Sequence, residues 1–233
     1  MDHWPRYAIY FVPAPESALY QYGSAVLGYD CYTGETTDFP DEFKTDAPHW
    51  RELTEEPRRY GFHATLKAPF HLAPSRSEAQ LIGALRDFAG LAHAVRPIEP
   101  SVEPIGGFIA IVPREPERSI DSLAASCTMM LDAYRAPMSA QERARRVTSG
   151  LSASQTQNLD RWGYPYVLAE FRFHMTLAGK IAPHHRDAIL KLLRDCSHRM
   201  STERSISVDR LALVKQDSSA SRFRVISHAV IGR

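Results

Sequence analysis

The chain has 233 residues, of which 44% are hydrophobic and 24% charged, so its composition is that of a folded protein and excludes a disordered one. With 28 Lys and Arg against 27 Asp and Glu, the net charge of +1 excludes a protein that holds long nucleic acid or an anionic membrane through its overall field. Three widely spaced cysteines and the lack of a membrane-length apolar stretch argue against a disulfide framework, a structural zinc site and a membrane span, and predict a cytoplasmic protein.

The chain begins with an apolar strand followed by a helix. Residues 7–12 are apolar and β-rich, which predicts a strand. Residues 15–27 repeat apolar side chains at helical spacing and end at Gly28, a residue suited to a helix C-terminus. A short helix over residues 47–55 is expected to stop before Pro57.

Two amphipathic helices and a strand are predicted next. A capping box opens a helix over residues 77–88, and a second helix spans residues 119–134. Between them, residues 102–112 read as a strand that bends at Gly106 and Gly107. The glycine pair lacks the spacing of a phosphate-binding loop, so we assign it no ligand role.

Residues 137–163 predict a helical insertion that carries an arginine cluster. Arg143, Arg145 and Arg146 lie in its first helix. We interpret them as a solvated helix face, with a lid that grips the substrate as the alternative. The insertion is followed by a helix near Pro183 and by two closing strands that form a hairpin.

One short phrase occurs twice, close to half the chain apart. The copies are Tyr-Gly-Phe-His-Ala-Thr-Leu-Lys at residues 60–67 and Phe-Arg-Phe-His-Met-Thr-Leu-Ala at residues 171–178. Successive side chains of a strand point to opposite faces, so His63 shares a face with Thr65, and His174 shares a face with Thr176. Each phrase therefore predicts a strand with an apolar face toward a core and a His/Thr face toward a polar ligand.

The duplication predicts an α+β fold in which two lobes form a pseudo-twofold pair. Each lobe is expected to be an antiparallel sheet with flanking helices and one His-x-Thr strand that faces a central cleft. We treat residues 1–233 as a single bilobed domain, with approximate repeats over residues 1–113 and 114–233 and the helical insertion near 137–163.

Two imidazoles and two hydroxyls suit acid-base cleavage of a phosphodiester. Histidine titrates near neutral pH, so one copy can accept a proton while the other donates one. Each threonine can hydrogen-bond a phosphate oxygen. Lys67 and Arg172 are the cations on the polar faces, and because they do not align with each other they would grip the substrate asymmetrically.

The sequence predicts neither a metal nor a cofactor. It contains no His-x-x-x-His or His-Glu-x-x-His motif, and both phrases lack carboxylates. A metal site built from His63 and His174 with remote ligands is the alternative.

The doubled Phe-His-x-Thr-Leu pattern resembles the two-histidine phosphoesterases, a superfamily of bilobed α+β proteins with one His-x-Thr/Ser motif per lobe. The resemblance implies that His63 and His174 are the catalytic pair and that Thr65 and Thr176 bind phosphate. A closer resemblance covers most of the chain and is to uncharacterised members encoded in bacterial phosphonate-utilisation operons. It is carried by residues 6–13, 27–30, 60–72 and 162–177.

These resemblances imply a metal-independent hydrolase of a small cyclic phosphate, such as a phosphoribosyl cyclic phosphate of phosphonate metabolism. The alternatives are a non-catalytic binder of a phosphorylated metabolite and an enzyme that processes RNA 2′,3′-cyclic phosphate ends. We expect a monomer that has a small phosphorylated partner and no membrane partner.

Overall fold

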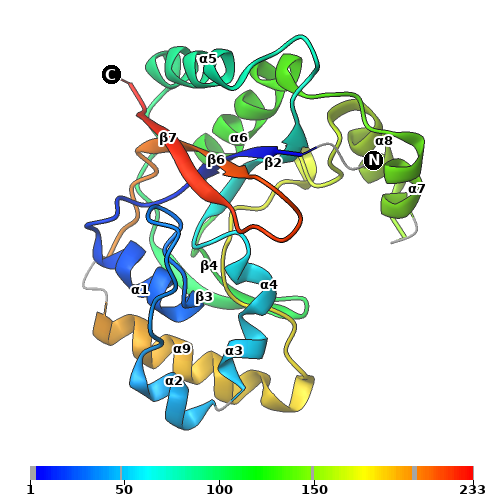
Figure 1. Cartoon of the computed structure of the whole chain (residues 1–233). Helices are drawn as coiled ribbons and strands as arrows, with labels where there is room; N and C mark the ends of the chain where they lie inside the picture. Colours follow the sequence, from blue (N-terminus) through cyan, green and yellow to red (C-terminus); the bar gives the residue numbers. More distant parts are fainter. Residues whose placement is uncertain (1–3, 48, 148–149, 201–203, 233) are drawn as a thin grey trace.

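A single antiparallel sheet forms the frame of the molecule (Figure 1). The structure is a computed structural model that describes residues 4–47, 49–147, 150–200 and 204–232. Within these residues the strands are β1 (Arg6–Phe11), β2 (Ala64–His71), β3 (Pro100–Ile105), β4 (Phe108–Pro113), β5 (Met175–Ala178), β6 (Arg210–Gln216) and β7 (Arg224–Val230). They lie in the order β3-β4-β5-β2-β1-β6-β7, and every neighbouring pair is antiparallel. The predicted α+β class with antiparallel pairing is confirmed.

Helices occupy most of the connections between the strands. The α-helices are α1 (Ala18–Leu27), α2 (Asp41–Asp46), α3 (Trp50–Leu53), α4 (Glu55–Arg58), α5 (Glu78–Leu91), α6 (Arg118–Met130), α7 (Ala140–Val147), α8 (Ala153–Trp162) and α9 (Arg186–Met200). Three short 3₁₀ segments are η1 (Asp132–Tyr134), η2 (Leu168–Glu170) and η3 (Pro183–His185). None of the helices in these described ranges combines the length and the apolar character that crossing a membrane needs.

The predicted elements differ from the observed ones at two glycines and a proline. Gly106 and Gly107 are the turn of a β3–β4 hairpin, so the strand predicted over residues 102–112 is two strands. Pro57 lies inside α4, where we expected helical structure to have stopped. It is the third residue of that helix, and a proline in a first turn removes no intrahelical hydrogen bond.

The order of elements repeats along the chain. The series β1-α1-β2-α5-β3 is followed by β4-α6-β5-α9-β6, with β7 added at the end. In the sheet, the matching strands lie symmetrically about the junction of β2 and β5. Two strands are exchanged between the copies, because β3 pairs with β4 and β6 pairs with β1.

The helices connect the two copies in the same exchanged way. Helix α1 contacts β5 and α9, whereas α6 contacts β2. Helix α5 contacts β6 and β7, and α9 contacts β3. Figure 1 shows α5 and α6 near one end of the molecule and α1 and α9 near the other. Each copy therefore contributes structure to both halves of the sheet.

The apolar faces of both repeated phrases are buried, as predicted. The side chains concerned are Phe62, Ala64, Leu66, Phe173, Met175 and Leu177, and none is more than 6% exposed. A Cβ added to Gly23 of α1 would lie 2.2 Å from the ring of Phe62. Only glycine at this position therefore lets α1 approach the first phrase this closely.

Candidate active site

The two His-x-Thr motifs meet at the centre of the sheet. Strands β2 and β5 are joined by one bridge, between Ala64 and Met175, and the histidines directly precede these two residues. Continuing that antiparallel register by one residue places His63 opposite Thr176 and Thr65 opposite His174. The four motif side chains are thus interleaved across the junction.

Both histidines line one open cavity of about 290 Å³. Thr176 and Lys180 line it from the second motif and the residues that follow it, and Tyr60 lines it from the residues before the first motif. The full lining is Glu56, Pro57, Tyr60, Gly61, His63, Gly107, Phe108, His174, Thr176, Gly179 and Lys180. We predicted that the two His-x-Thr strands face a central cleft, and this cavity is lined by both histidines.

A backbone carbonyl orients each imidazole in the same way. The Nδ1 of His63 is 2.8 Å from the carbonyl oxygen of Gly61, and the Nδ1 of His174 is 2.8 Å from that of Arg172. A carbonyl oxygen only accepts, so each Nδ1 carries a proton and donates it. In a neutral ring, Nε2 is then the free base, and it is the atom available to a ligand.

The first histidine is covered by a tyrosine. The Tyr10 ring stacks on His63 with 3.8 Å between ring centroids and 25° between ring planes. Burial lowers the pKa of His63 from 6.5 to about 4. The backbone hydrogen bond to Gly61 raises this pKa, and the charge of His174 lowers it. The Oγ of Thr65 lies 3.1 Å from Nε2 and can donate to it. His63 is therefore a neutral imidazole at pH 7.

The second histidine lacks such a cover. In the β1–β2 pair Tyr10 lies opposite Thr65, and in the β4–β5 pair Ala110 lies opposite Thr176. Ala110 is thus the counterpart of Tyr10, and its methyl group cannot stack on a ring. His174 instead contacts Phe108, with 5.4 Å between centroids and 49° between planes.

A β-bulge follows the threonine in both motifs. Tyr10 pairs with Thr65 and Ile9 with Lys67, so Leu66 is the extra residue of β2. Likewise Ala110 pairs with Thr176 and Ile109 with Ala178, so Leu177 is the extra residue of β5. An inserted residue breaks the alternation of side chains along a strand.

The bulge explains why Lys67 does not line the cavity. Directly opposed residues share a face, and Ile9 and Tyr10 point to opposite faces, so Lys67 and Thr65 do as well. The prediction that Lys67 shares the face of His63 and Thr65 is therefore wrong. The cause is that side chains of β2 alternate between the two faces of the sheet only as far as the bulge at Leu66.

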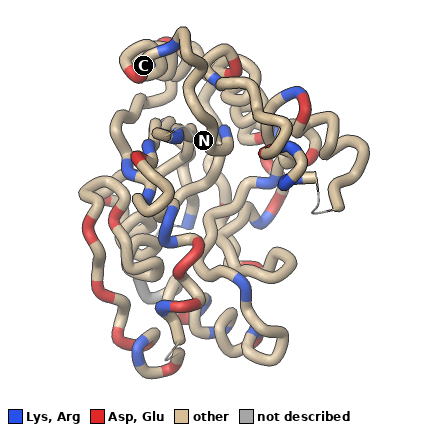
Figure 2. Tube along the Cα trace, turned by 45° about the vertical axis from the view of Figure 1, so that its right-hand side comes forward, with Lys and Arg blue, Asp and Glu red and all other residues tan. Residues whose placement is uncertain are grey.

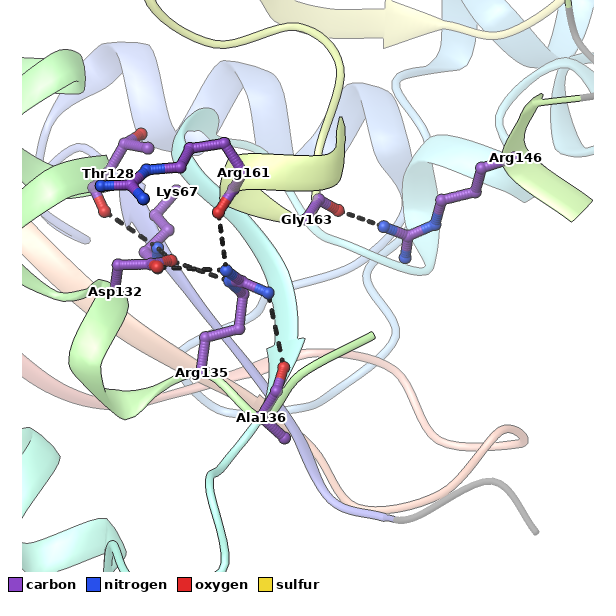
Figure 3. A network of polar contacts seen from close by, with 8 residues as sticks. All are labelled: Lys67, Thr128, Asp132, Arg135, Ala136, Arg146, Arg161 and Gly163. Carbon is purple, nitrogen blue, oxygen red and sulfur yellow. Dashed lines mark hydrogen bonds and ion pairs between the residues drawn. The ribbon is translucent and has the colours of Figure 1, made fainter. Parts of the chain in front are cut away.

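Lys67 belongs to a buried polar network on the far side of β2 (Figure 3). Its side chain is 4% exposed, and its Nζ donates to the carbonyl of Thr128 at 3.1 Å and to Asp132 at 3.2 Å. Arg135 binds both oxygens of Asp132, at 2.7 and 3.0 Å, and donates to the carbonyl of Arg161. The network joins β2 to α6 and α8, so Lys67 contributes to the packing of these elements.

The remaining predicted site residues divide between the cavity and its support. Thr176 lines the cavity, and Thr65 supports His63 from beside it. Arg172 holds His174 through its backbone carbonyl, while its side chain is exposed and is not among the residues that line the cavity. The structure thus gives Arg172 a backbone contact, whereas we predicted a side-chain contact with substrate.

Sequence reasoning missed four residues around the histidines. Tyr10 and Phe108 contact the rings, and Tyr60 and Lys180 line the cavity. The segments Ile9-Tyr10-Phe11-Val12 and Ile109-Ala110-Ile111-Val112 occupy matching strands, and aligning them would have identified Tyr10. The sequence held no comparable sign for Lys180.

Two arginines of the insertion, Arg143 and Arg146, contact other residues of the insertion. Arg143 pairs with Asp160 of α8 at 2.5 Å, and Arg146 pairs with Glu142 at 2.7 Å and contacts the carbonyl of Gly163. These contacts agree with a surface helix pair and leave no arginine of α7 among the residues that line the cavity. Across the described ranges, His, Cys, Asp and Glu do not gather in threes as a metal site requires.

Sequence and structure comparisons find similar proteins along most of the chain. The chain is 33% identical over 221 residues to ribose 1,5-bisphosphate phosphokinase PhnN of Janthinobacterium sp. (strain Marseille), covering 94% of the chain and 49% of that protein. The chain spans about half the length of the curated relatives it matches, or less.

Two solved structures align over 98% of the chain. A conserved protein of unknown function from Agrobacterium tumefaciens is 11% identical, with a TM-score of 0.46 and 86% of its own length covered. LigT of E. coli, in complex with NADP+, is 16% identical, with a TM-score of 0.37 and 98% of its own length covered.

The family match gives the most direct placement of the chain. We predicted from the motifs a resemblance to the two-histidine phosphoesterases and, more closely, to uncharacterised proteins of phosphonate-utilisation operons. The family that matches is one of uncharacterised proteins, in agreement with the closer resemblance. The model described as protein of unknown function (DUF1045) matches residues 65–224, which is more than half of the sequence, so the chain belongs to the DUF1045 family.

Proposed function

We propose that this chain is a phosphoric diester hydrolase that opens a small cyclic phosphate by acid-base catalysis between His63 and His174. One observation carries the proposal. Two imidazoles from the two copies of the repeat line a single cavity, and each is fixed by a carbonyl so that Nε2 is available to a ligand. A phosphodiester needs one group to activate water and another to protonate the leaving oxygen, and this pair supplies both.

The different surroundings of the rings assign the two roles. His63 is neutral at pH 7, so its Nε2 takes a proton from water as the oxygen attacks phosphorus. One phosphorus–oxygen bond forms, the bond to the sugar oxygen breaks, and the role of acid falls to His174, which must carry a proton on Nε2 to give it to that oxygen. Proton exchange with solvent then resets both rings. The Thr65 hydroxyl that contacts Nε2 of His63 turns to the phosphate when substrate enters.

The cavity also offers groups that can hold a phosphate anion. Thr176 supplies a hydroxyl, and Lys180 supplies a positive charge. Holding the phosphorus in line between water and leaving group is a large part of the catalytic effect of such a site. Tyr60 and Phe108 are aromatic residues of the lining that can pack against a sugar ring.

The size of the cavity and the relatives support a phosphorylated ribose as substrate. About 290 Å³ lies at the lower end for ligand pockets, which suits a sugar phosphate better than an RNA end. The matched relatives are named as kinases of ribose 1,5-bisphosphate, a molecule of this class. The chain has no Gly-x-x-x-x-Gly-Lys-Ser/Thr loop for ATP, so we propose phosphoester hydrolysis for it and not the kinase reaction.

Phosphorus NMR on a panel of cyclic phosphates tests the proposal, with and without a chelator. We expect hydrolysis of a ribosyl cyclic phosphate that the chelator leaves unchanged. His63→Ala and His174→Ala should each lower kcat by ~10²–10⁴ and keep the fold, whereas His228→Ala on the exposed face of β7 should have no effect. Full activity in both single variants would contradict the proposal, and binding without turnover would make the chain a carrier or sensor.

A further inference from the structure

A second cavity, separate from the one with the histidines, is surrounded by arginines. It has a volume of about 510 Å³ and lies between α3, α4 and the turn that joins β6 to β7. Arg51, Arg58, Arg59 and Arg222 line it, together with Glu52 and Glu55 and the turn residues 219–221. Although acidic and basic residues are interspersed along the chain as a whole (Figure 2), this cavity has four guanidinium groups against two carboxylates.

The four arginines have no carboxylate partner among the described residues. None forms an ion pair within 4.0 Å, and Glu52 is instead 3.7 Å from His49. Ion pairs are formed elsewhere on the described surface, for example between Arg143 and Asp160. The two glutamates of the lining therefore offset the positive charge around this cavity only in part, and within the described part of the chain none of the four arginines is ion-paired.

Arg58 is buried, and a buried charge without a counter-ion is energetically unfavourable. Arg58 is 6% exposed, and its guanidinium donates to the carbonyls of Leu27 at 2.7 Å and Arg51 at 3.0 Å, and to Thr54. Burial lowers the pKa of Arg58, and the charges of Arg51 and Arg222 lower it further, more strongly than Glu55 opposes them. Its Nε and Nη2 are bound by neutral groups, and no carboxylate among the described residues pairs with it, so an anion in the cavity would balance a charge that the protein leaves without a counter-ion.

The walls of the cavity are held in place before any ligand enters. Arg222 lies over the Tyr29 ring at 4.7 Å and donates to Thr36 at 3.2 Å. Arg59 donates to the carbonyl of Ser219 at 2.9 Å, and its own carbonyl accepts from Phe223 at 2.8 Å. Binding an anion here would require little reorganisation of Arg58 and Arg222, which favours affinity, whereas the exposed Arg51 side chain would move to meet the anion.

We propose that this cavity binds a phosphate monoester through Arg51, Arg58 and Arg222. One guanidinium can donate to two phosphate oxygens at once, and several guanidinium groups around one cavity can contact more of the phosphate than a single surface cation can. Helix α4 separates the two cavities: Glu56 and Pro57 line the one with the histidines, and Glu55 and Arg58 line the one with the arginines. The monoester is either a second phosphate of the substrate or a separate phosphorylated metabolite.

Calorimetric titration with inorganic phosphate tests the site independently of catalysis. The experiment uses the His63→Ala/His174→Ala protein, which removes turnover, and each arginine variant is compared in that same background, so that any phosphate held by Thr176 and Lys180 in the first cavity is common to all samples. In that background we expect Arg51→Gln/Arg222→Gln to weaken phosphate binding at least tenfold, from ~1.5–3 kcal/mol per charged hydrogen bond lost. Arg86→Gln/Arg118→Gln removes the same charge from exposed positions and should leave binding unchanged.

Two results distinguish the outcomes. Equal phosphate affinity in the Arg51/Arg222 and Arg86/Arg118 variants, with matching circular dichroism spectra, would overturn the proposal. If the double variant does not fold, Arg51→Gln alone carries the same test, because this side chain is exposed. A KM raised only for substrates with a second phosphate would identify the substrate as ligand, and an unchanged KM with lost phosphate binding would identify a separate metabolite.

Discussion

The stacked tyrosine makes the two histidines chemically different. Tyr10 covers His63, whose pKa is lowered to about 4, whereas Ala110 leaves the matching position on the other copy open. A general base works only when neutral, so in the wild type kcat/KM should fall with acid only as the pH approaches 4. With a pKa near the ordinary 6.5, the same loss would begin more than two pH units higher.

Removing the stacked ring should therefore move the acid limb of the pH profile upward. We expect Tyr10→Ala to shift it toward 6.5, because water then reaches the imidazole and stabilises its charged form. Tyr10→Phe keeps the ring and should retain the wild-type limb. NMR titration of the His63 ring protons checks that this group moves. An unmoved limb in a folded Tyr10→Ala protein would contradict the role of Tyr10.

The two lysines near the motifs offer a matched comparison. Lys180 lines the cavity, whereas Lys67 is buried behind β2 with Asp132. Lys180→Met should raise KM about tenfold or more with a stable fold, because a charged contact to phosphate is lost. Lys67→Met should leave KM unchanged. Steady-state kinetics on both variants checks this, and a KM increase confined to Lys67→Met would reverse the assignment.

At this scale the sequence predicts histidines better than cations. A His-x-Thr phrase repeated with its aromatic and leucine neighbours singles out His63 and His174 without knowledge of the fold, and the structure places both in the lining of one cavity. The same parity argument failed two residues later at Lys67, because a bulge depends on the partner strand. Tyr10 comes from another strand, so its contact with His63 has no local signature.

At the scale of elements, Gly61 allows the turn that orients His63. Its φ is +77°, and an added Cβ would lie 2.6 Å from the Cβ of Cys31. Gly61→Ala should destabilise the fold by ~1–3 kcal/mol from backbone strain, and more from the clash. It should also lower kcat, because the carbonyl that holds Nδ1 of His63 is displaced.

A second glycine isolates the effect of strain. Gly106 in the β3–β4 turn has φ +56° and nothing within 4 Å of an added Cβ. Gly106→Ala should therefore cost stability through strain alone and should leave kcat unchanged. Urea unfolding and initial rates on both variants check this. Equal loss of kcat in the two would argue against the orienting role of Gly61.

The elements themselves are predicted where the signal is local. The capping box of Ser77 and Gln80 opens α5 as expected, and Gly28 ends α1 in the left-handed conformation. Helix α2 has no capping hydrogen bond and one buried side chain, Phe43, so its six residues give little periodicity to detect. Short helices of this kind depend on tertiary packing more than on their own sequence.

For the whole molecule, the exchanged packing predicts a single unfolding transition. Within the part of the chain that the structure describes, a single bridge between Ala64 and Met175 pairs the two halves of the sheet, yet α1 contacts β5 and α6 contacts β2. Neither half can lose its structure without exposing apolar surface of the other, so cooperativity should span the molecule.

Single-tryptophan proteins measure this directly. Trp50 is buried in α3 of the first repeat, and Trp162 ends α8 of the second. With the other tryptophans replaced by phenylalanine, the two fluorescence reporters should give the same urea midpoint as far-UV circular dichroism. Separate midpoints would show that the halves unfold independently.

The exchange of strands lay beyond sequence reasoning. Repeated motifs and element order indicate two copies, but pairing of β3 with β4 and of β6 with β1 depends on contacts between distant segments. Local sequence patterns do not indicate which copy supplies the strand that pairs at each side of the sheet.

The exchange also bears on how such a molecule can be assembled from simpler parts. A chain holding one copy, β-α-β-α-β, would leave an unpaired sheet edge and a lone imidazole. Two such chains, related by a twofold axis between their His-x-Thr strands, would complete each other's sheets and bring two identical histidines to one cavity. Fusion of the copies into one polypeptide would free each to diverge, and a tyrosine in one strand against an alanine in its counterpart is enough to give two identical side chains different surroundings.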